Sequence, residues 1–301
     1  MTALPRTPSD RPGRLSVGVV GVGRVGSVLG AALRRAGHQV VAASAVSSGS
    51  LARAARLLPD AEILPVDQVA AKADLLLLAV PDDALASLVA GLAETGSIQA
   101  GQLIVHTSGA HGIDVLAPAA GALPVALHPV MTFTGRPEDL DRIAGISYGI
   151  TAPEQMRPVA EVLVLEMGGE PEWIAEADRT LYHAALAHGA NHVTTLVNEA
   201  LALLRQAGVV HPERMVAPLL SAALDNTLRL GDAALTGPVA RGDSGTVAAH
   251  LATLTARAPD SVAAYLALAR RTADRAIESG RLRSTDAEAL LEVLASPGVT
   301  R

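Results

Sequence analysis

The residues with the clearest chemical meaning are three glycines near the N-terminus, Gly21, Gly23 and Gly26. They follow an apolar run of strand length and open a segment with helical periodicity. In such a turn the first glycine allows the sharp bend, the second lets a diphosphate approach the backbone, and the third lets helix and strand pack closely. The alternative is a tight turn without a ligand. We expect the turn to hold a dinucleotide diphosphate at the positive end of the helix, through Gly21, Val22, Gly23, Arg24, Val25 and Gly26.

Residues 40–50 bear on which dinucleotide would bind. Sites that select NAD usually place an Asp or Glu about 20 residues after the glycine turn, where it binds the ribose hydroxyls. This segment has no carboxylate. It has serines that could donate to a 2′-phosphate, and an arginine that could neutralise one follows; these residues are Ser44, Ser47, Ser48 and Arg53. The alternative is that the serines only cap a helix near Ser50. The sequence therefore predicts NADPH as the cofactor in preference to NADH.

Polar residues stand at the ends of three predicted strands, in the runs 80–82 (VPD), 107–109 (TSG) and 128–129 (HP). Ligands of parallel sheets lie at this carboxyl edge. Each run alone is also typical of a turn. We expect the three runs to converge where a nicotinamide ring would sit. Cofactor contacts would come from Val80, Pro81, Asp82, Thr107 and Ser108, and substrate contacts from Gly109 and His128.

A polar stripe crosses the apolar helical segment TLYHAALAHGANHVTTLVNEALALL. At 100° per residue, His183, Asn191, Thr194 and Asn198 fall within an arc of about 80°. His183 could act as the general acid that protonates the atom left negative by hydride delivery. Asn191, the second predicted catalytic residue, could hold the carbonyl or carboxylate of the substrate, with Thr194 beside it. The alternative is a polar network between packed helices.

A loop rich in turn-forming residues, LTGPVARGDSG, surrounds Arg241 and Asp243. A guanidinium presented by such a loop could bind a substrate carboxylate through two parallel hydrogen bonds. The alternative is a connection between helices in which Asp243 or Ser244 caps the next helix. Arg241 is therefore a candidate substrate-binding residue.

Other kinds of catalytic site have little support in the composition. The chain has no cysteine, so thiolate nucleophiles, disulfides and zinc–thiolate sites are excluded. Lys72 is its only lysine. His188 and His192 have the i, i+4 spacing of metal ligands, with Glu199 on the same side, but no companion motif supports a metal. We predict that no metal is bound and that these residues face solvent or a second copy.

The elements that must position these residues alternate between strand and helix from residue 15 onward. Expected strands are 15–20, 38–44, 62–64, 74–80, 102–107 and 123–128, with helices at 24–36, 50–58 and 82–93. A further strand, helix and strand are expected at 146–151, 153–167 and 171–174. Continuous apolar strands alternating with helices indicate a parallel sheet covered on both faces. The predicted fold class is therefore α/β, a doubly wound parallel sheet.

After about Glu176 the pattern is wholly helical, with segments expected at 177–208, 212–230, 246–256, 260–279 and 285–294. We therefore expect a disordered leader over 1–13, a dinucleotide-binding domain over 14–176, an all-α domain over 177–296 and a tail over 297–301. The net charge of −6 and the 2% of aromatic residues argue against nucleic-acid binding. No apolar run is long enough to span a membrane, and no signal peptide is present, so a cytoplasmic location is expected.

Several motifs together give the chain a family resemblance. The glycine turn, AVPD, HTSGAHG, LHPVMTF, YHAALAHGAN and TGPVARGD resemble a bacterial group of Rossmann-type oxidoreductases with a helical C-terminal domain of unknown function. More distantly, the chain is similar to pyrroline-5-carboxylate reductase, ketopantoate reductase and the β-hydroxyacid dehydrogenases. The resemblance implies a homodimer formed through the helical domains and an active site in the interdomain cleft.

One departure from these relatives affects the expected mechanism. β-Hydroxyacid dehydrogenases and ketopantoate reductase carry a lysine one turn before the asparagine of the long helix, where this chain has Ala187. His183 is our substitute for that lysine. The expected function is NADPH-dependent reduction of a small carbonyl compound that carries a carboxylate, with ketopantoate as the first candidate implied by the resemblance. The alternatives are a cyclic imine reductase and a non-catalytic NADP-binding sensor or scaffold; a deazaflavin is left open as a second cofactor.

Overall fold

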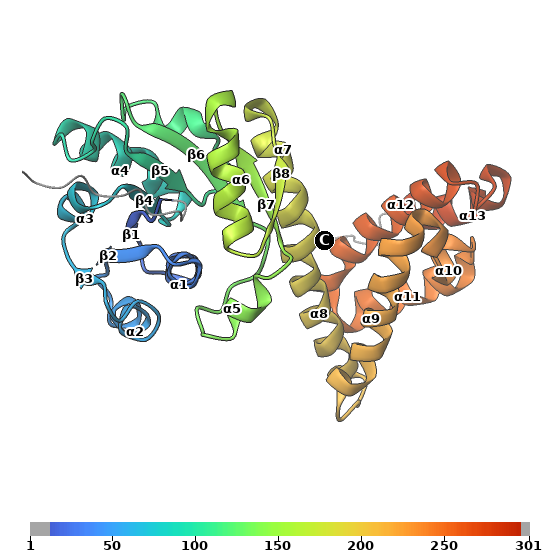
Figure 1. Ribbon diagram of the computed structural model, residues 1–301. Coiled ribbons are helices and arrows are strands. Elements are labelled where there is room, and N and C mark those ends of the chain that lie inside the picture. Colours follow the sequence, from blue (N-terminus) through green and yellow to red (C-terminus); the bar gives the residue numbers. More distant parts are fainter. Residues whose placement is uncertain (1–12, 296–301) are drawn as a thin grey trace, which may run out of the picture. The chain divides into compact units, whose positions relative to one another are not determined.

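A computed structural model describes residues 13–295 (Figure 1). The predicted tail, and the predicted leader apart from residue 13, lie outside the described residues. The contacts divide the chain after His188 into two compact units. We call residues 13–188 the N-terminal unit and residues 189–295 the helical unit, and describe each by itself. This division falls later than the expected domain boundary near Glu176, because Arg179 and Tyr182 bond to the strand ends of the N-terminal unit.

Within the described residues, the N-terminal unit contains one sheet with the strand order β3-β2-β1-β4-β5-β6-β7-β8. The strands are β1 (Ser16–Val20), β2 (Gln39–Ser44), β3 (Glu62–Ile63), β4 (Leu75–Leu78), β5 (Leu103–His106), β6 (Leu123–Pro129), β7 (Ser147–Thr151) and β8 (Glu170–Trp173). This order, with β1 in the middle and strands added on both sides, is that of a doubly wound Rossmann sheet and confirms the predicted fold class.

The last two strands of the described sheet, β7 and β8, run against the other six. We expected a wholly parallel sheet, whereas β7 is antiparallel to β6. The segment from Pro129 to Ser147 contains only the short helix α5 (Asp139–Arg142), and a parallel return usually needs a longer crossover helix. The pairing places Gly149 opposite His128 and therefore bears directly on the candidate site.

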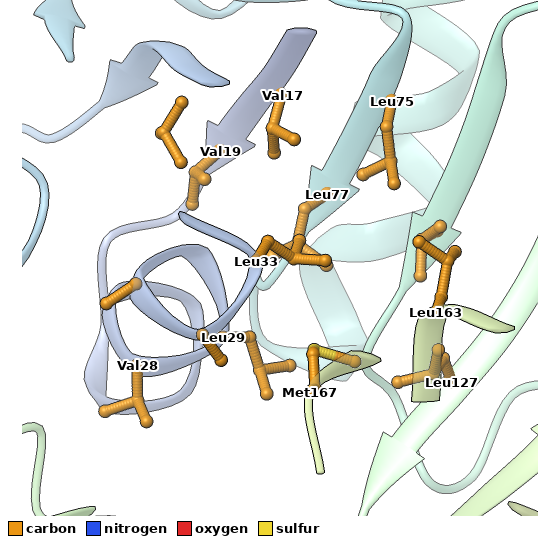
Figure 2. Close-up of a cluster of buried hydrophobic side chains, with 14 of the residues drawn as sticks. Val17, Val19, Val28, Leu29, Leu33, Leu75, Leu77, Leu127, Leu163 and Met167 are labelled. Atoms are coloured by element: carbon orange, nitrogen blue, oxygen red, sulfur yellow. The ribbon is translucent and has the colours of Figure 1, made fainter. Parts of the chain in front are cut away.

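Helices cover both faces of the sheet (Figure 1). One core joins α1 (Arg24–Ala36), α2 (Ser48–Leu57) and α6 (Arg157–Glu166) to the sheet; Figure 2 shows part of it, including Val19, Leu29 and Leu77. The other core lies under α3 (Val66–Lys72) and α4 (Asp82–Glu94). Most helices were predicted to within a few residues. The seven-residue α3 was missed because it is short and has no capping side chain.

The last helix of the N-terminal unit is α7 (Arg179–Leu186), and a π-helical turn over Ala187–Asn191 joins it to the next helix. The sequence predicted one regular helix over 177–208. The π turn interrupts the regular spacing of about 100° per residue on which the predicted polar stripe depends. The inference that His183 and Asn198 lie on one polar stripe therefore does not hold.

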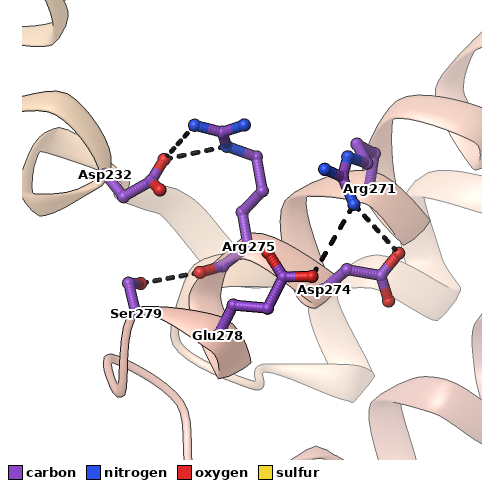
Figure 3. A network of polar contacts seen from close by, with 6 residues as sticks. All are labelled: Asp232, Arg271, Asp274, Arg275, Glu278 and Ser279. Atoms are coloured by element: carbon purple, nitrogen blue, oxygen red, sulfur yellow. Dashed lines mark hydrogen bonds and ion pairs between the residues drawn. The ribbon is translucent and has the colours of Figure 1, made fainter.

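The helical unit consists of α8 (His192–Gln206), α9 (Pro212–Leu230), α10 (Gly237–Ala240), α11 (Ser244–Arg257), α12 (Val262–Glu278) and α13 (Ser284–Ala295). Its core lies among α10 to α13 and includes Val247, Ala273 and Leu290. Figure 3 shows Arg275 of α12 bonded to Asp232, with Nε 2.8 Å from Oδ1. In the described part of the chain, no helix has both the length and the apolar character that a membrane crossing requires.

Candidate functional site

The three glycines of the β1–α1 turn have separate structural roles. Gly21 has a φ of +90°, a region that favours glycine, and a Cβ there would collide with the carbonyl oxygen of Ala79. A Cβ at Gly26 would collide with the backbone of Gly21, so α1 and the turn could not pack as they do. A Cβ at Gly23 would meet nothing within 4 Å. The second glycine thus borders open space, which suits close approach by a diphosphate.

A cavity of about 660 Å³ borders this turn. Its walls come from the β1–α1 turn, the end of β2, the start of α2 and the β4–α4 turn. Eight of the predicted cofactor-binding residues line the cavity: Gly21, Val22, Gly23, Ser44, Ser47, Arg53, Val80 and Pro81. Seven others do not: Arg24, Val25, Gly26, Ser48, Asp82, Thr107 and Ser108. The structure thus brings these eight residues together around one cavity, and their contacts with a cofactor stay predictions.

Arg53 is the one charged residue among those that line this cavity in the described chain. Its Nε donates to the carbonyl oxygen of Val22 at 3.1 Å, so the side chain is fixed against the glycine turn. A Cβ at Gly49, in the first turn of α2, would lie 3.6 Å from Arg53 Nη1. The guanidinium therefore lies between the glycine turn and the positive end of α2, where it would favour an anion.

The serines after β2 divide between two roles. Ser47 caps α2, accepting a hydrogen bond from the backbone N–H of Ser50 at 3.1 Å. The helix begins at Ser48 rather than at the expected Ser50. The capping alternative is therefore correct for Ser47, although this residue also lines the cavity. Ser44 is buried at the end of β2 and lines the cavity, whereas Ser48 is exposed outside it.

The loop that follows β5 is organised by a buried histidine. His106 Nδ1 accepts the backbone N–H of Ser108 at 3.2 Å, so the ring donates through Nε2 to the carbonyl oxygen of Gly112 at 2.8 Å. Burial lowers the pKa of His106 to about 4, and it is therefore neutral near pH 7. Ser108 Oγ accepts the N–H of His111 at 3.1 Å. The polar groups of Ser108 thus shape the loop, and its predicted contact with the cofactor stays a prediction.

Arg179, at the start of α7, joins this loop to β7. It is 1% exposed, and its guanidinium donates to the carbonyl oxygens of His111, Gly149 and Ser108 at 2.9, 3.0 and 2.7 Å. Burial lowers the pKa of Arg179. Three carbonyl acceptors satisfy the buried cation and at the same time fix the position of α7 relative to the strand ends.

Glu176 supports the same junction from the preceding turn. Its carboxylate accepts the backbone N–H groups of Ile113 and Asp114 at 2.8 and 3.2 Å. Neither Glu176 nor Arg179 was predicted from the sequence as a residue of the site. Arg179 precedes His183 by four residues, and this helical spacing is the one signal that relates it to the predicted site.

The structure brings together three predicted residues: Gly109, His128 and His183. The rings of His128 and His183 meet edge to face, with centroids 5.9 Å apart. A Cβ at Gly109 would lie 3.1 Å from His128 Nε2 and 2.5 Å from His183 Cδ2, so both rings border this glycine. Tyr182, which was not predicted from the sequence, completes the cluster because its hydroxyl lies 2.8 Å from His128 Nδ1.

Burial governs the protonation of this cluster. It lowers the pKa of His128 to about 4, and the charges of Arg179 and His183 act in the same direction. Burial raises the pKa of Tyr182 against the opposing effects of the Arg179 charge and a backbone hydrogen bond from Gly149. Near pH 7 the site therefore holds a neutral His128 beside a protonated Tyr182.

The remaining candidates, Asn191, Thr194 and Arg241, belong to the helical unit, where all three are exposed. Thr194 Oγ1 lies 3.4 Å from the carbonyl oxygen of Ala190 in its own helix. Beside Arg241, Asp243 caps α11 by accepting the N–H of Thr246 at 3.0 Å, as the capping alternative predicted. The substrate contacts assigned to these three residues stay predictions.

Among residues 13–295 no group of three or more His, Asp or Glu side chains could hold a metal ion. The i, i+4 argument for His188 and His192 does not hold, because His188 lies within the π turn. The predicted absence of a metal stays a prediction.

Comparisons with known proteins identify two domain families. Residues 1–129 match the Rossmann-like domain, and residues 146–272 match a domain of unknown function, DUF2520. No curated protein sequence matches the chain. The two matches agree with the resemblance found in the sequence motifs.

Solved structures share the fold. A Bacteroides fragilis protein described as a "putative NADP oxidoreductase" aligns with a TM-score of 0.72 and 23% identity, over 87% of this chain and 98% of its own. A Thermotoga maritima protein aligns with a TM-score of 0.63 and 19% identity, over 88% of this chain and 100% of its own. The pyrroline-5-carboxylate reductase of Streptococcus pyogenes aligns with a TM-score of 0.59 and 16% identity, over 88% of this chain and 99% of its own. At these identities the likeness is one of fold.

His106 should make the N-terminal unit sensitive to acid. The unfolded chain takes up a proton as the pH falls below about 6.5, whereas the folded chain keeps His106 neutral down to about 4. The stability that depends on neutral His106 is therefore complete above pH 6.5 and is lost as the pH falls toward 4. By pH 5 the loss from this residue amounts to about 2 kcal/mol. We expect His106→Gln to remove that loss, because glutamine does not titrate.

Urea unfolding at pH 7 and pH 5 measures this effect, and the single tryptophan, Trp173 of β8, reports on the N-terminal unit. His211→Gln is the matched control, because His211 is exposed in the helical unit. It should keep the wild-type pH dependence. An equal loss between pH 7 and pH 5 in wild type and His106→Gln would contradict the assignment.

Proposed function

We propose that this chain, which joins a Rossmann-like domain to a DUF2520 domain, is an NADPH-dependent oxidoreductase. The observation that carries the proposal is the cavity beside the glycine turn, with Arg53 as its charged lining residue and with no carboxylate at the end of β2. Fold relatives described as a "putative NADP oxidoreductase" and as a pyrroline carboxylate reductase with NADP bound support the same class.

The choice of NADPH over NADH follows from the charge of this cavity. A carboxylate at the end of β2 would bind the ribose hydroxyls of NADH and repel a 2′-phosphate. Here Ser44 and Ser47 offer hydroxyl groups, and Arg53 offers a cation whose Nε is already held by Val22. Because that contact already orients the guanidinium, cofactor binding would cost little further side-chain entropy at Arg53.

The proposed reaction is reduction of a small carbonyl compound that carries a carboxylate. Bound NADPH would supply the hydride to the carbonyl carbon. His183 would donate a proton to the carbonyl oxygen, which completes an alcohol, and His183 would then recover its proton from solvent. Gly109 leaves room beside both His183 and His128 because it has no side chain. Asn191, Thr194 and Arg241 are proposed as substrate contacts on their chemistry, with Arg241 for the carboxylate.

The decisive experiment measures NADPH oxidation by the full chain across a panel of 2-oxo acids and cyclic imines, with nucleotide binding followed by fluorescence in the same samples. Ketopantoate is the first 2-oxo acid to include. Saturable turnover of a 2-oxo acid supports the proposal. Turnover of a cyclic imine alone would favour the imine reductase, which needs no strong acid and suits a chain with Ala187 in place of lysine. Nucleotide binding without any turnover would favour the sensor.

Arg53→Ala should weaken NADPH binding about 10- to 100-fold, the cost of losing a charge-assisted hydrogen bond. Binding of NADH should change little, because NADH has no 2′-phosphate. Titration of the chain with each nucleotide measures both dissociation constants. Arg34→Ala is the matched control, since Arg34 is an exposed arginine of α1 that pairs with Asp60 outside the cavity. Equal losses for the two nucleotides would remove Arg53 from 2′-phosphate recognition.

His183→Ala should lower kcat about 10²- to 10⁴-fold, as expected for loss of a general acid, and should leave the dissociation constant of NADPH unchanged. The NADPH oxidation assay and the fluorescence titration give the two values. His211→Ala, which changes an exposed histidine of the helical unit, serves as the control. Unchanged turnover in His183→Ala would exclude this histidine as the acid and would favour the imine reductase.

A homodimer through the helical unit is part of the proposal. On α9, Met215, Leu219, Leu224 and Leu228 are 56%, 66%, 60% and 78% exposed. Met215 and Leu219 are four residues apart and lie on one side of the helix, whereas Leu224 and Leu228, also four residues apart, lie on the opposite side. Exposed apolar surface of this extent on a globular chain usually marks an interface. A second copy offers the same Leu224–Leu228 side, so an isologous contact through this side would bury both copies of it at once.

Leu224→Asp should therefore halve the molecular mass measured by light scattering, because it would place a carboxylate in each half of the apolar contact. The residue is already exposed in the single chain, so the substitution should not disturb its folding. Leu165→Asp is the control, since Leu165 is 60% exposed on α6 of the N-terminal unit. A wild-type mass equal to that of one chain would contradict this interface. A mass equal to that of a dimer for Leu224→Asp would contradict it as well.

A further inference from the structure

The antiparallel pairing of β6 and β7 creates a space beside His128. Gly149 lies directly opposite His128 in the pairing, so the two positions face the same side of the sheet. A Cβ at Gly149 would lie 2.6 Å from Tyr182 Cζ. The phenol of Tyr182 thus fills the space that any other residue at position 149 would need. From there its hydroxyl lies 2.8 Å from His128 Nδ1.

The direction of this hydrogen bond follows from the neighbouring groups. Burial raises the pKa of Tyr182, so its hydroxyl keeps its proton. The carbonyl oxygen of Gly149 already accepts from Arg179 Nη1 at 3.0 Å. Among the described residues, His128 Nδ1 is the one acceptor within hydrogen-bond distance of the hydroxyl, so we assign the hydroxyl proton to this bond. A neutral imidazole that accepts at Nδ1 carries its proton on Nε2.

The Nε2 side of His128 faces the candidate site. A Cβ at Gly109 would lie 3.1 Å from Nε2, and the His183 ring borders the same glycine. Within residues 13–295, Nε2 has no hydrogen-bond partner, and it is not among the fully enclosed polar atoms that lack one. The ring therefore presents a fixed N–H group that the fold of the N-terminal unit leaves unused.

We propose that His128 is a neutral hydrogen-bond donor to the substrate carbonyl oxygen and that Tyr182 is the positioning residue that holds its proton on Nε2. The proposal rests on the reductase function proposed above and divides the work between two histidines. His183 transfers a proton, whereas His128 stabilises the developing negative charge without giving up its own proton. A neutral imidazole in such a role remains a donor throughout the reaction.

The chain offers a matched pair in the helical unit. There His250 Nδ1 lies 2.9 Å from the Tyr265 hydroxyl, and the ring centroids are 5.9 Å apart at 85°. In the His128–Tyr182 pair, Nδ1 lies 2.8 Å from the hydroxyl, and the ring centroids are 5.6 Å apart at an interplanar angle of 89°. Because both pairs have the same chemistry, Tyr265→Phe removes an equivalent hydrogen bond away from the proposed site.

Imidazole ¹⁵N NMR on the full chain without cofactor tests the tautomer directly. The His128 signals are identified by their absence in His128→Gln. We expect the wild-type ring to be neutral with its proton on Nε2. Tyr182→Phe keeps the aromatic ring but not the hydroxyl, so it should give a mixture of both tautomers. A wild-type proton on Nδ1, or an unchanged spectrum in Tyr182→Phe, would overturn the positioning role.

Turnover in the NADPH oxidation assay, with the panel compound that is reduced, tests the donor role. His128→Phe should lower kcat about 10²- to 10³-fold, as for loss of one donor to an oxyanion. Tyr182→Phe should lower it about 10-fold, with an unchanged NADPH dissociation constant. Tyr265→Phe should leave kcat unchanged. Equal effects of the two tyrosine variants would overturn the donor role. If no compound is reduced, the reductase function and the donor role both fail, while the NMR result still decides the tautomer.

Discussion

The candidate site depends on one buried cation. The guanidinium of Arg179 is almost wholly removed from water, and its hydrogen-bond acceptors are three backbone carbonyls rather than a carboxylate. A buried charge is costly unless its donors are satisfied, so the three carbonyls cannot move apart without leaving the cation unpaired. Since Tyr182 and His183 follow Arg179 by three and four residues, they lie on the same side of α7 and are carried to the strand ends with it.

The reversed strand supplies the other half of this arrangement. The carbonyl oxygen of Gly149 in β7 accepts a hydrogen bond from Arg179, and Gly149 lies opposite His128 of β6. A parallel β7 would present a different register, and neither contact would form. The absence of a side chain at Gly149 then leaves the space for Tyr182. The change of strand direction between β6 and β7 is therefore a requirement of the site.

The parts of the structure that local sequence determines were the ones predicted well. The bounds of α1 and α9 were predicted correctly because apolar periodicity and flanking glycines mark both helices. The glycine turn was predicted because the spacing of its glycines, after an apolar run and before a helical segment, is visible in one short stretch of sequence. The grouping of Gly109, His128 and His183 followed only in part, from the rule that strand ends converge. Arg179, Tyr182 and the direction of β7 were missed, because they depend on contacts between segments far apart in the chain.

The two histidines show why chemical roles were harder to predict than positions. In the sequence, His128 and His183 each lie in an apolar run that also holds small residues, and nothing local separates a proton donor from a fixed hydrogen-bond donor. The difference arises in three dimensions, because burial and the nearby charge of Arg179 both disfavour the protonated form of His128. The cation that fixes α7 thus adds to the effect of burial in keeping His128 neutral. A substitution that weakened the junction would therefore change the chemistry of the site as well as its geometry.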